Sequence, residues 1–110
     1  MKLLSRAEEI VLLTILKLKG NAYGVTIRDL IHRETGTQWS FGSIYTPLNK
    51  LTRKKYVRKI MGEPTSERGG RSKCLYEVTE KGLEALRQIR EVQDSVWADV
   101  PFAFLHPENK

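Results

Sequence analysis

The residues most able to engage a partner chemically are the basic ones between positions 49 and 73. This segment holds nine lysines and arginines against two acids, so its net charge is 9 − 2 = +7, while the whole chain carries +6. The nine bases are Lys50, Arg53, Lys54, Lys55, Arg58, Lys59, Arg68, Arg71 and Lys73. Because soluble surfaces usually intersperse both signs of charge, this cluster favours a polyanionic partner. A plain solvated surface is the alternative.

Polar side chains recur at helical spacing through the first part of this region. They fall on one side of a helix predicted over residues 40–55, and they are Ser43, Thr46, Asn49, Lys50 and Arg53. Asn pairs with adenine in two hydrogen bonds, and Arg or Lys does so with guanine. Downstream, Gly69-Gly70-Arg71 combines an unhindered backbone with a guanidinium, which suits a minor groove or a phosphate. Duplex DNA is the favoured partner. Taken singly, each of these residues is explained equally well as an ordinary exposed polar side chain.

Composition argues against several other kinds of protein. With 110 residues, 40% of them hydrophobic, the chain suits one globular unit. Cys74 is the only cysteine, so no intrachain disulfide can form and a reducing cytoplasm is the expected location. His32 and His106 have no metal-ligand spacing with it, and we expect neither a metal nor another cofactor. No stretch approaches the roughly 20 apolar residues of a membrane span, and no signal peptide is expected.

Hydrophobic periodicity predicts two helices before the basic segment. Ser5 and Glu8 have the spacing of a capping box at the start of a helix over 5–18, and Gly20 suits the left-handed residue that follows it. A second helix is predicted over 23–34 and should end at Gly36.

A third helix is predicted over 40–55, with Ser40 as its cap. Its apolar positions share one face, and they are Phe41, Ile44, Leu48 and Leu51. Pro47 lies inside it and predicts a slight bend, because proline removes one backbone hydrogen bond.

Two strands are expected next, over 56–61 and 74–78. The insert between them, 62–71, has glycine or proline near both ends and no apolar residue. We therefore predict that residues 62–71 form a mobile hairpin tip.

The last predicted helix covers 80–98, capped by Thr79 and ended before Pro101. One stripe along it is apolar and consists of Leu83, Leu86, Ile89, Val92 and Val96. We expect this stripe and a second apolar surface on the helix over 5–18 to be buried together in a twofold homodimer. A tail over 101–110 is more apolar than most free tails.

The order of these elements predicts a mainly α protein with a small β-wing, an α+β winged helix-turn-helix. Residues 1–78 would form the DNA-binding domain, and 79–110 the C-terminal dimerisation helix and tail.

Several short motifs resemble the PadR family of bacterial transcriptional repressors. They are Ala-Tyr-Gly at 22–24, Ser-Phe-Gly-Ser-Ile-Tyr-Thr-Pro-Leu at 40–48, Tyr-Val at 56–57, Gly-Arg at 70–71 and Tyr-Glu-Val-Thr-Glu-Lys-Gly at 76–82. The resemblance covers about residues 10–86. It implies a winged-helix repressor that dimerises through its C-terminal helix and inserts its third helix into the major groove.

The resemblance also assigns residues. The family's DNA-contacting face falls on Ser43, Tyr45, Thr46, Asn49 and Lys50, and its wing on residues 68–73. Tyr45 would pack its ring and bring its hydroxyl near a phosphate, or be purely structural. Gly42 and Gly82 would serve close packing of helices rather than a ligand.

Small members of the family sense aromatic or drug-like compounds between the two C-terminal helices. Trp97 is the residue here that could stack on such an effector, and packing in the dimer interface is the alternative role. This chain departs from the family's long continuous helix at Pro101 and adds 102–105, which puts the effector pocket in doubt.

Three other readings compete with a DNA-binding regulator. An enzyme is not expected, because no nucleophile and base, phosphate loop or paired acids occur at a meaningful spacing. A winged-helix module that holds only a protein partner would have an uncharged recognition face. RNA binding requires exposed aromatic residues for stacking, and only Trp39 and Tyr45 are near the basic face.

Overall fold

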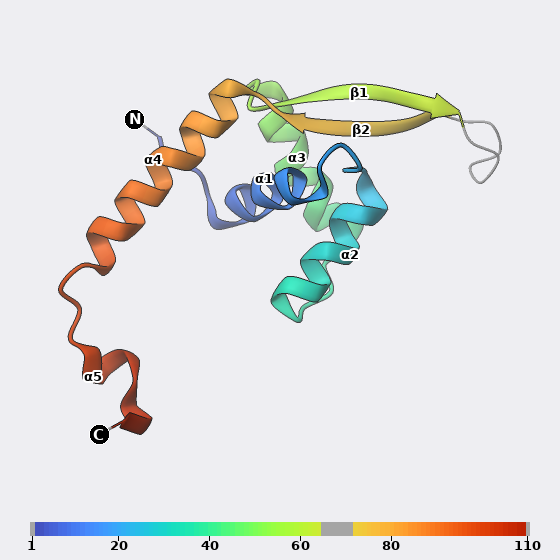
Figure 1. Cartoon of the computed structure of the whole chain (residues 1–110). Coiled ribbons are helices and arrows are strands. Elements are labelled where there is room, and N and C mark those ends of the chain that lie inside the picture. Colours follow the sequence, from blue (N-terminus) through green and yellow to red (C-terminus); the bar gives the residue numbers. More distant parts are fainter. Residues whose placement is uncertain (1, 65–71, 110) are drawn as a thin grey trace.

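The computed structural model describes residues 2–64 and 72–109, in a mainly helical arrangement with one β-hairpin (Figure 1). The elements follow one another in the predicted order. They are α1 (Arg6–Leu18), α2 (Gly24–Thr35), α3 (Phe41–Arg53), β1 (Val57–Pro64), β2 (Ser72–Val78), α4 (Glu80–Trp97), α5 (Phe102–Leu105) and the 3₁₀ helix η2 (Pro107–Asn109). The predicted class, mainly α with a small antiparallel wing, is confirmed.

Two capping residues predicted from sequence are in place: Ser5 begins α1 and Gly36 ends α2. Ser5 Oγ accepts a hydrogen bond from the Glu8 backbone N–H at 3.1 Å, and Glu8 Oε1 accepts one from the Ser5 N–H at 2.8 Å. Gly36 ends α2 with a left-handed φ of 76°. After α1 both Lys19 and Gly20 adopt left-handed φ angles, so the left-handed turn begins one residue earlier than predicted.

The end of α3 and the length of the wing differ from prediction. The helix stops at Arg53, since Lys55 adopts a left-handed φ of 66° and the Tyr56 N–H bonds back to the Leu51 carbonyl at 2.9 Å. The chain then turns into β1, which extends to Pro64 through a register shift after Met61. Residues 62–64 are therefore strand and not hairpin tip, whereas 65–71 lie outside the described residues.

The core forms where α1, α2 and α3 meet the base of the hairpin. Ile44, Leu48 and Leu51 are fully buried, as the spacing in α3 predicted. Phe41, at the first turn of the same helix, is 39% exposed and so contributes less to the core than these three. The Tyr76 N–H donates to the Ala22 carbonyl at 2.8 Å and thereby fixes the wing against the turn before α2.

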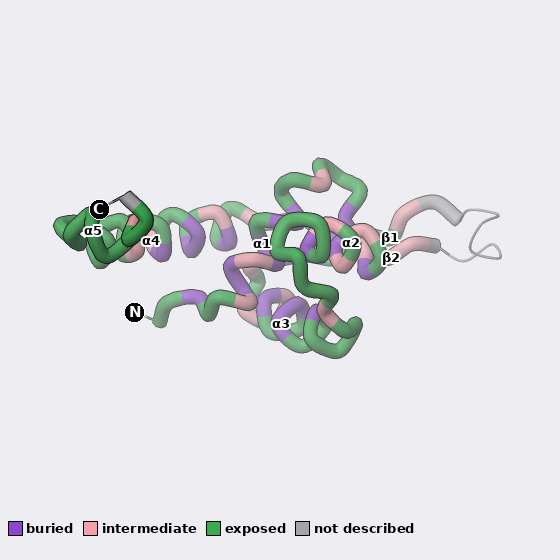
Figure 2. The backbone as a smooth tube through the Cα atoms, turned by 90° about the horizontal axis from the view of Figure 1, so that it is seen from below, coloured by how far each residue is buried: buried purple, intermediate pink, exposed green. Residues whose placement is uncertain are grey.

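Helix α4 leaves the core along its length, and the chain beyond it extends into solvent (Figure 2). Its first half contributes Ala85, Leu86 and Ile89 to the core. The Cα radius of gyration is 16.7 Å, compared with about 13 Å for a compact domain of this length. This elongation leaves Val96 and the apolar residues of α5 exposed in the described part of the chain. No helix in the described residues is both long and apolar enough to cross a membrane.

Candidate nucleic-acid interface

One face of α3 carries the residues that were predicted to contact DNA. All six residues predicted on it are exposed, and they are Ser43, Tyr45, Thr46, Asn49, Lys50 and Arg53. The opposite face is anchored in the core by Ile44, Leu48 and Leu51. The position of the polar side chains therefore depends on a rigid helix rather than on a loop.

Most of these polar groups are available to a ligand. Ser43 is the exception, because its hydroxyl shares a hydrogen bond of 3.0 Å with Ser40 Oγ at the helix cap. Within residues 2–64 and 72–109, the side chains of Thr46, Asn49, Lys50 and Arg53 make no hydrogen bond or ion pair. Their donors and acceptors are free to meet base edges or phosphates.

Tyr45 joins α3 to the start of α2. Its ring lies 6.4 Å from that of Phe41, and its hydroxyl packs over Gly24. A methyl group at position 24 would displace that hydroxyl, so the present position of the Tyr45 ring depends on glycine here. The ring is thus partly packed, as the family resemblance implied. A role of its hydroxyl at a phosphate stays a prediction.

Two of the clustered bases are neutralised by acids elsewhere in the chain. Lys54 Nζ lies 2.9 Å from Glu8 Oε2, and an Arg58 nitrogen lies 2.6 Å from Glu77 Oε1. Since both acids lie outside 49–73, these pairs reduce the segment's charge of +7 by two, to +5. The segment therefore remains strongly positive after pairing with these two outside acids.

Aromatic rings hold two further cations beside α3. Lys73 Nζ sits 4.7 Å from the centre of the Tyr23 ring, which fixes this predicted DNA-contacting residue at the base of the wing. The Arg28 guanidinium lies 4.2 Å from the centre of the Phe41 ring, and its buried Nε has no hydrogen-bond partner among the described residues. Arg28 was missed from sequence, because only the packing of α2 on α3 brings it to this face. The other predicted wing residues, Arg68 and Arg71, lie outside the described residues.

Comparison with known proteins identifies the family. The profile of the transcriptional regulator PadR-like family matches residues 12–88. The chain belongs to the PadR-like family. It is a winged-helix transcriptional regulator of a family that binds DNA.

Solved structures agree with the PadR-like assignment. A PadR family transcription regulator from Clostridium difficile R20291 is 25% identical, with a TM-score of 0.63 over 81% of this chain and 88% of that one. A transcriptional regulator from Clostridium thermocellum is 20% identical, with a TM-score of 0.69 over 82% of each chain. RosR from H. salinarum is 22% identical, with a TM-score of 0.65 over 96% of this chain and 88% of its own. A search of curated proteins finds no match.

The two glycines of the PadR-like motifs have different surroundings. A methyl group on Gly82 would collide with the Tyr56 carbonyl oxygen, so α4 packs closely on the chain entering the wing. Around Gly42 the nearest atom to such a methyl is Ser40 Oγ at 3.8 Å. Close packing therefore explains Gly82, but the same explanation for Gly42 is wrong because Gly42 is exposed.

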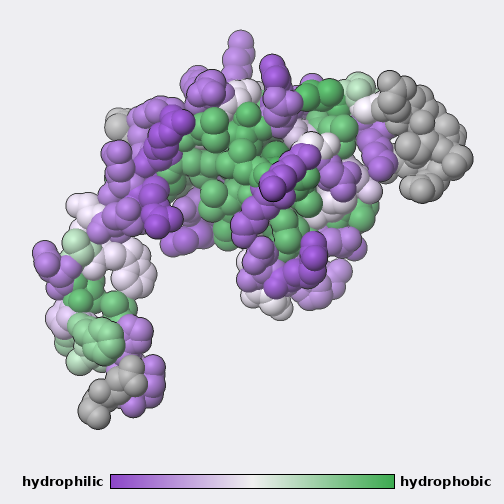
Figure 3. Space-filling view, in the orientation of Figure 1, coloured by the Kyte–Doolittle hydropathy of each residue, from purple (hydrophilic) through white to green (hydrophobic). Residues whose placement is uncertain are grey.

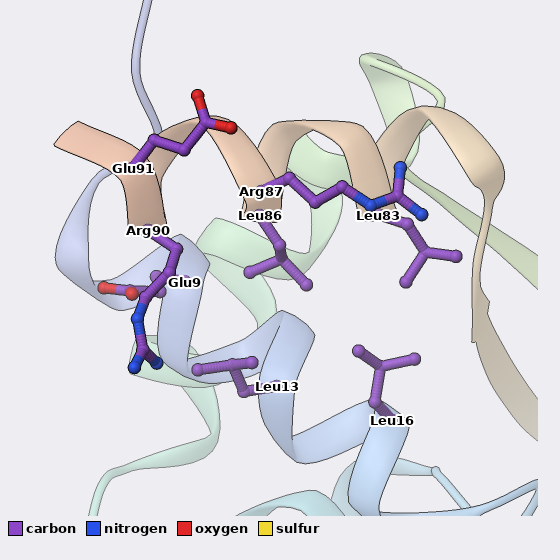
Figure 4. A pocket seen from close by; sticks show the side chains of 8 residues that line it. All are labelled: Glu9, Leu13, Leu16, Leu83, Leu86, Arg87, Arg90 and Glu91. Carbon is purple, nitrogen blue, oxygen red and sulfur yellow. The ribbon is translucent and has the colours of Figure 1, made fainter. Parts of the chain in front are cut away.

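A second surface of this PadR-like chain is apolar. Leu13 and Leu16 of α1 face Leu83 and Leu86 of α4 across a groove of about 460 Å³ (Figure 4). The groove is rimmed by charged residues, Glu9, Arg87, Arg90 and Glu91. In space-filling view an apolar area occupies the same face, with polar residues around it (Figure 3).

The five residues predicted for dimerisation are not equally exposed. Leu86 and Ile89 are buried in the core of the chain itself, and Leu83 is half-buried in the groove. Val92 is more exposed, and Val96 reaches 71%. Trp97, the candidate effector residue, is 57% exposed at the end of α4. The free apolar surface thus lies on the distal half of α4 and in the groove.

Proposed function

We propose that this chain is a homodimeric repressor that reads a pseudo-palindromic DNA site through α3 and is released by a small aromatic or drug-like effector. The observation that carries the proposal is the exposed face of α3, where unpaired polar side chains lie within a segment of local charge +5. A base-reading helix needs this combination of donors and surrounding positive charge.

Each residue of the interface has a proposed part. Asn49 pairs with an adenine edge, while Ser43, Thr46 and Tyr45 contact bases or phosphates nearby. Lys73, and with it Arg68 and Arg71, holds the phosphate backbone alongside the wing. These contacts belong to residues 1–78, the proposed DNA-binding domain.

Residues 79–110 form the proposed dimerisation helix and tail. The distal half of α4 exposes Val92 and Val96, and the groove between α1 and α4 exposes the apolar side chains of Leu13, Leu16 and Leu83. Pairing these surfaces across a twofold axis would cover both. Leu86 and Ile89 then support the interface from inside each protomer.

The effector is proposed to stack on Trp97, whose indole is exposed and lies close to the proposed twofold interface. Packing of the indole against the partner subunit is the competing role. Titrating aromatic compounds into wild type and into the Trp97→Ala variant distinguishes the two roles. If Trp97 binds an effector, the variant loses ligand binding and stays dimeric.

Selection of bound sequences from a random duplex pool tests the proposal. A twofold dimer should enrich a pseudo-palindrome with half-sites one helical turn, about 10 base pairs, apart. Enrichment of an asymmetric site would contradict the twofold arrangement of the two subunits on DNA. Failure to bind any duplex would favour the second candidate, a winged helix that engages only a protein partner.

A further inference from the structure

A cleft separates the N-terminal segment, residues 2–5, from α3. Its volume is about 550 Å³, and its walls come from both elements. Lys2 and Ser5 line one side, and Thr46, Lys50 and Arg53 line the other. In Figure 2 the N-terminal segment runs toward α3 from the end of the molecule where the chain begins.

The cleft is positively charged. Of its five charged residues, Glu8 and Lys54 neutralise each other at 2.9 Å. Lys2, Lys50 and Arg53 remain, and none of the three has an ion-pair partner within the described ranges. Three uncompensated cations around one hollow favour an anion there.

The N-terminal segment is held in place beside α3. Leu4 is buried in the core, and the Ser5 N–H donates to Glu8, whose second oxygen accepts from Lys54 at the end of α3. Lys2 is only two residues from the buried Leu4, so its ammonium stays within reach of the cleft. The segment therefore behaves as a fixed wall rather than as a free arm.

The position of the cleft relative to α3 indicates which anion it meets. Lys50 and Arg53 belong to the exposed face of α3 and to the cleft at the same time. A helix about 10–12 Å across nearly fills a major groove about 12 Å wide, so sugar-phosphate strands flank it on both sides. Helix α2 and β1 pack against α3, and the N-terminal segment lies across the cleft from it, so an anion in the cleft would sit beside α3.

We propose that this cleft binds a backbone phosphate diester of the DNA, with Lys2, Lys50 and Arg53 as its ligands. The inference rests on the proposed insertion of α3 into the major groove. It makes Lys2 a DNA-binding residue and assigns Lys50 and Arg53 to the backbone instead of to guanine edges. Asn49, which does not line the cleft, keeps the base-reading part.

The whole chain with Lys2→Gln tests this site, and Lys19→Gln is the matched control. Lys19 is also an exposed lysine, but it lies in the turn after α1, outside the cleft. Removing one phosphate contact lowers the slope of log affinity against log salt by about 0.9. The proposed dimer loses one such contact in each half-site, two in all, so the loss of affinity between about 50 and 200 mM salt should be about tenfold smaller for Lys2→Gln than for wild type.

A second variant tests the assignment of Lys50. Lys50→Gln should weaken binding to the selected site and to random duplex by the same factor. The inference is overturned if Lys2→Gln retains the slope of the Lys19→Gln control, or if Lys50→Gln weakens only the selected site. If wild-type protein binds no duplex, the proposed function fails together with this site; normal wild-type binding with an unchanged Lys2→Gln slope refutes the site alone.

Discussion

The carboxylate of Glu8, at the start of α1, accepts hydrogen bonds from the Ser5 N–H at 2.8 Å and from Lys54 Nζ at 2.9 Å, at the end of α3. Burial alone would raise the pKa of Glu8, but the bonds from Ser5 and Lys54 and the charge of Lys54 outweigh it and lower the pKa below 4.5. One buried carboxylate thus ties the N-terminal segment to the proposed recognition helix.

Replacing Glu8 by glutamine should destabilise the fold while preserving its shape. We expect the free energy of unfolding to fall by about 1–2 kcal/mol at neutral pH, because hydrogen bonds to charged groups contribute about 1.5–3 kcal/mol and the partly exposed Lys54 is screened by water. Urea unfolding measures the change. Glu34→Gln is the control, since Glu34 pairs with Lys17 at an exposed site and should matter less.

The Glu8 contribution should also depend on pH. Because the folded-state pKa of Glu8 is depressed, its stabilisation is complete above the ordinary value of 4.5 and is lost as the pH falls through the folded value. Wild-type protein should therefore lose more stability than Glu8→Gln between about pH 6 and pH 3. Parallel pH profiles for the two proteins would show that Lys54 does not stabilise the ionised form.

Alanine at two glycines should have opposite effects on stability. Gly82→Ala places a methyl group against the Tyr56 backbone carbonyl, which cannot move without the wing, so a loss of about 1–3 kcal/mol is expected. Gly42→Ala makes only an ordinary contact with Ser40 Oγ on an exposed helix and should gain about 0.5–1 kcal/mol. Thermal unfolding of both variants decides the matter, and a stable Gly82→Ala protein would be inconsistent with the close approach of α4.

Asn49→Ala should affect specificity more than general affinity. If Asn49 pairs with a base, the variant loses about 1–3 kcal/mol of binding to the selected site and little to random duplex. Asn21→Ala, which removes an exposed asparagine from the turn before α2, should leave both affinities unchanged. Equal losses on the two duplexes would assign Asn49 to the phosphate backbone.

Glutamate in the distal half of α4 should separate the protomers without unfolding them. Val96 is largely exposed, so Val96→Glu costs the isolated protomer little but places charge in the proposed interface. Ile89→Glu is a less informative variant, because Ile89 is 8% exposed and belongs to the protomer's core. Sedimentation at micromolar concentration should show a wild-type dimer and a Val96→Glu monomer; a dimeric variant would place the interface elsewhere.

Local sequence chemistry was sufficient to predict much of the architecture. Ser5 caps α1 because its hydroxyl accepts a hydrogen bond from a backbone N–H of the first turn, and Gly36 ends α2 because glycine readily adopts the left-handed conformation. Neither effect depends on distant contacts. The spacing of Ile44, Leu48 and Leu51 identified the buried face of α3, since one apolar stripe per helix is a local property.

Features that depend on contacts between distant segments were not predictable in this way. Spacing placed Phe41 on the apolar face of α3 but could not show that it is 39% exposed and lies beneath the Arg28 guanidinium of another helix. The placement of Lys73 over Tyr23 and the pairing of Glu8 with Lys54 likewise join residues far apart in sequence. No helical or strand periodicity encodes such pairs.

The salt dependence of duplex affinity tests the central claim, that the positive face around α3 binds DNA. With a local charge of +5 on each protomer, neutralised phosphates should release their counterions on binding. Affinity for the selected duplex should then fall by about a hundredfold or more between 50 and 200 mM salt. A change of less than about twofold over that range would contradict electrostatic recognition of DNA by this face.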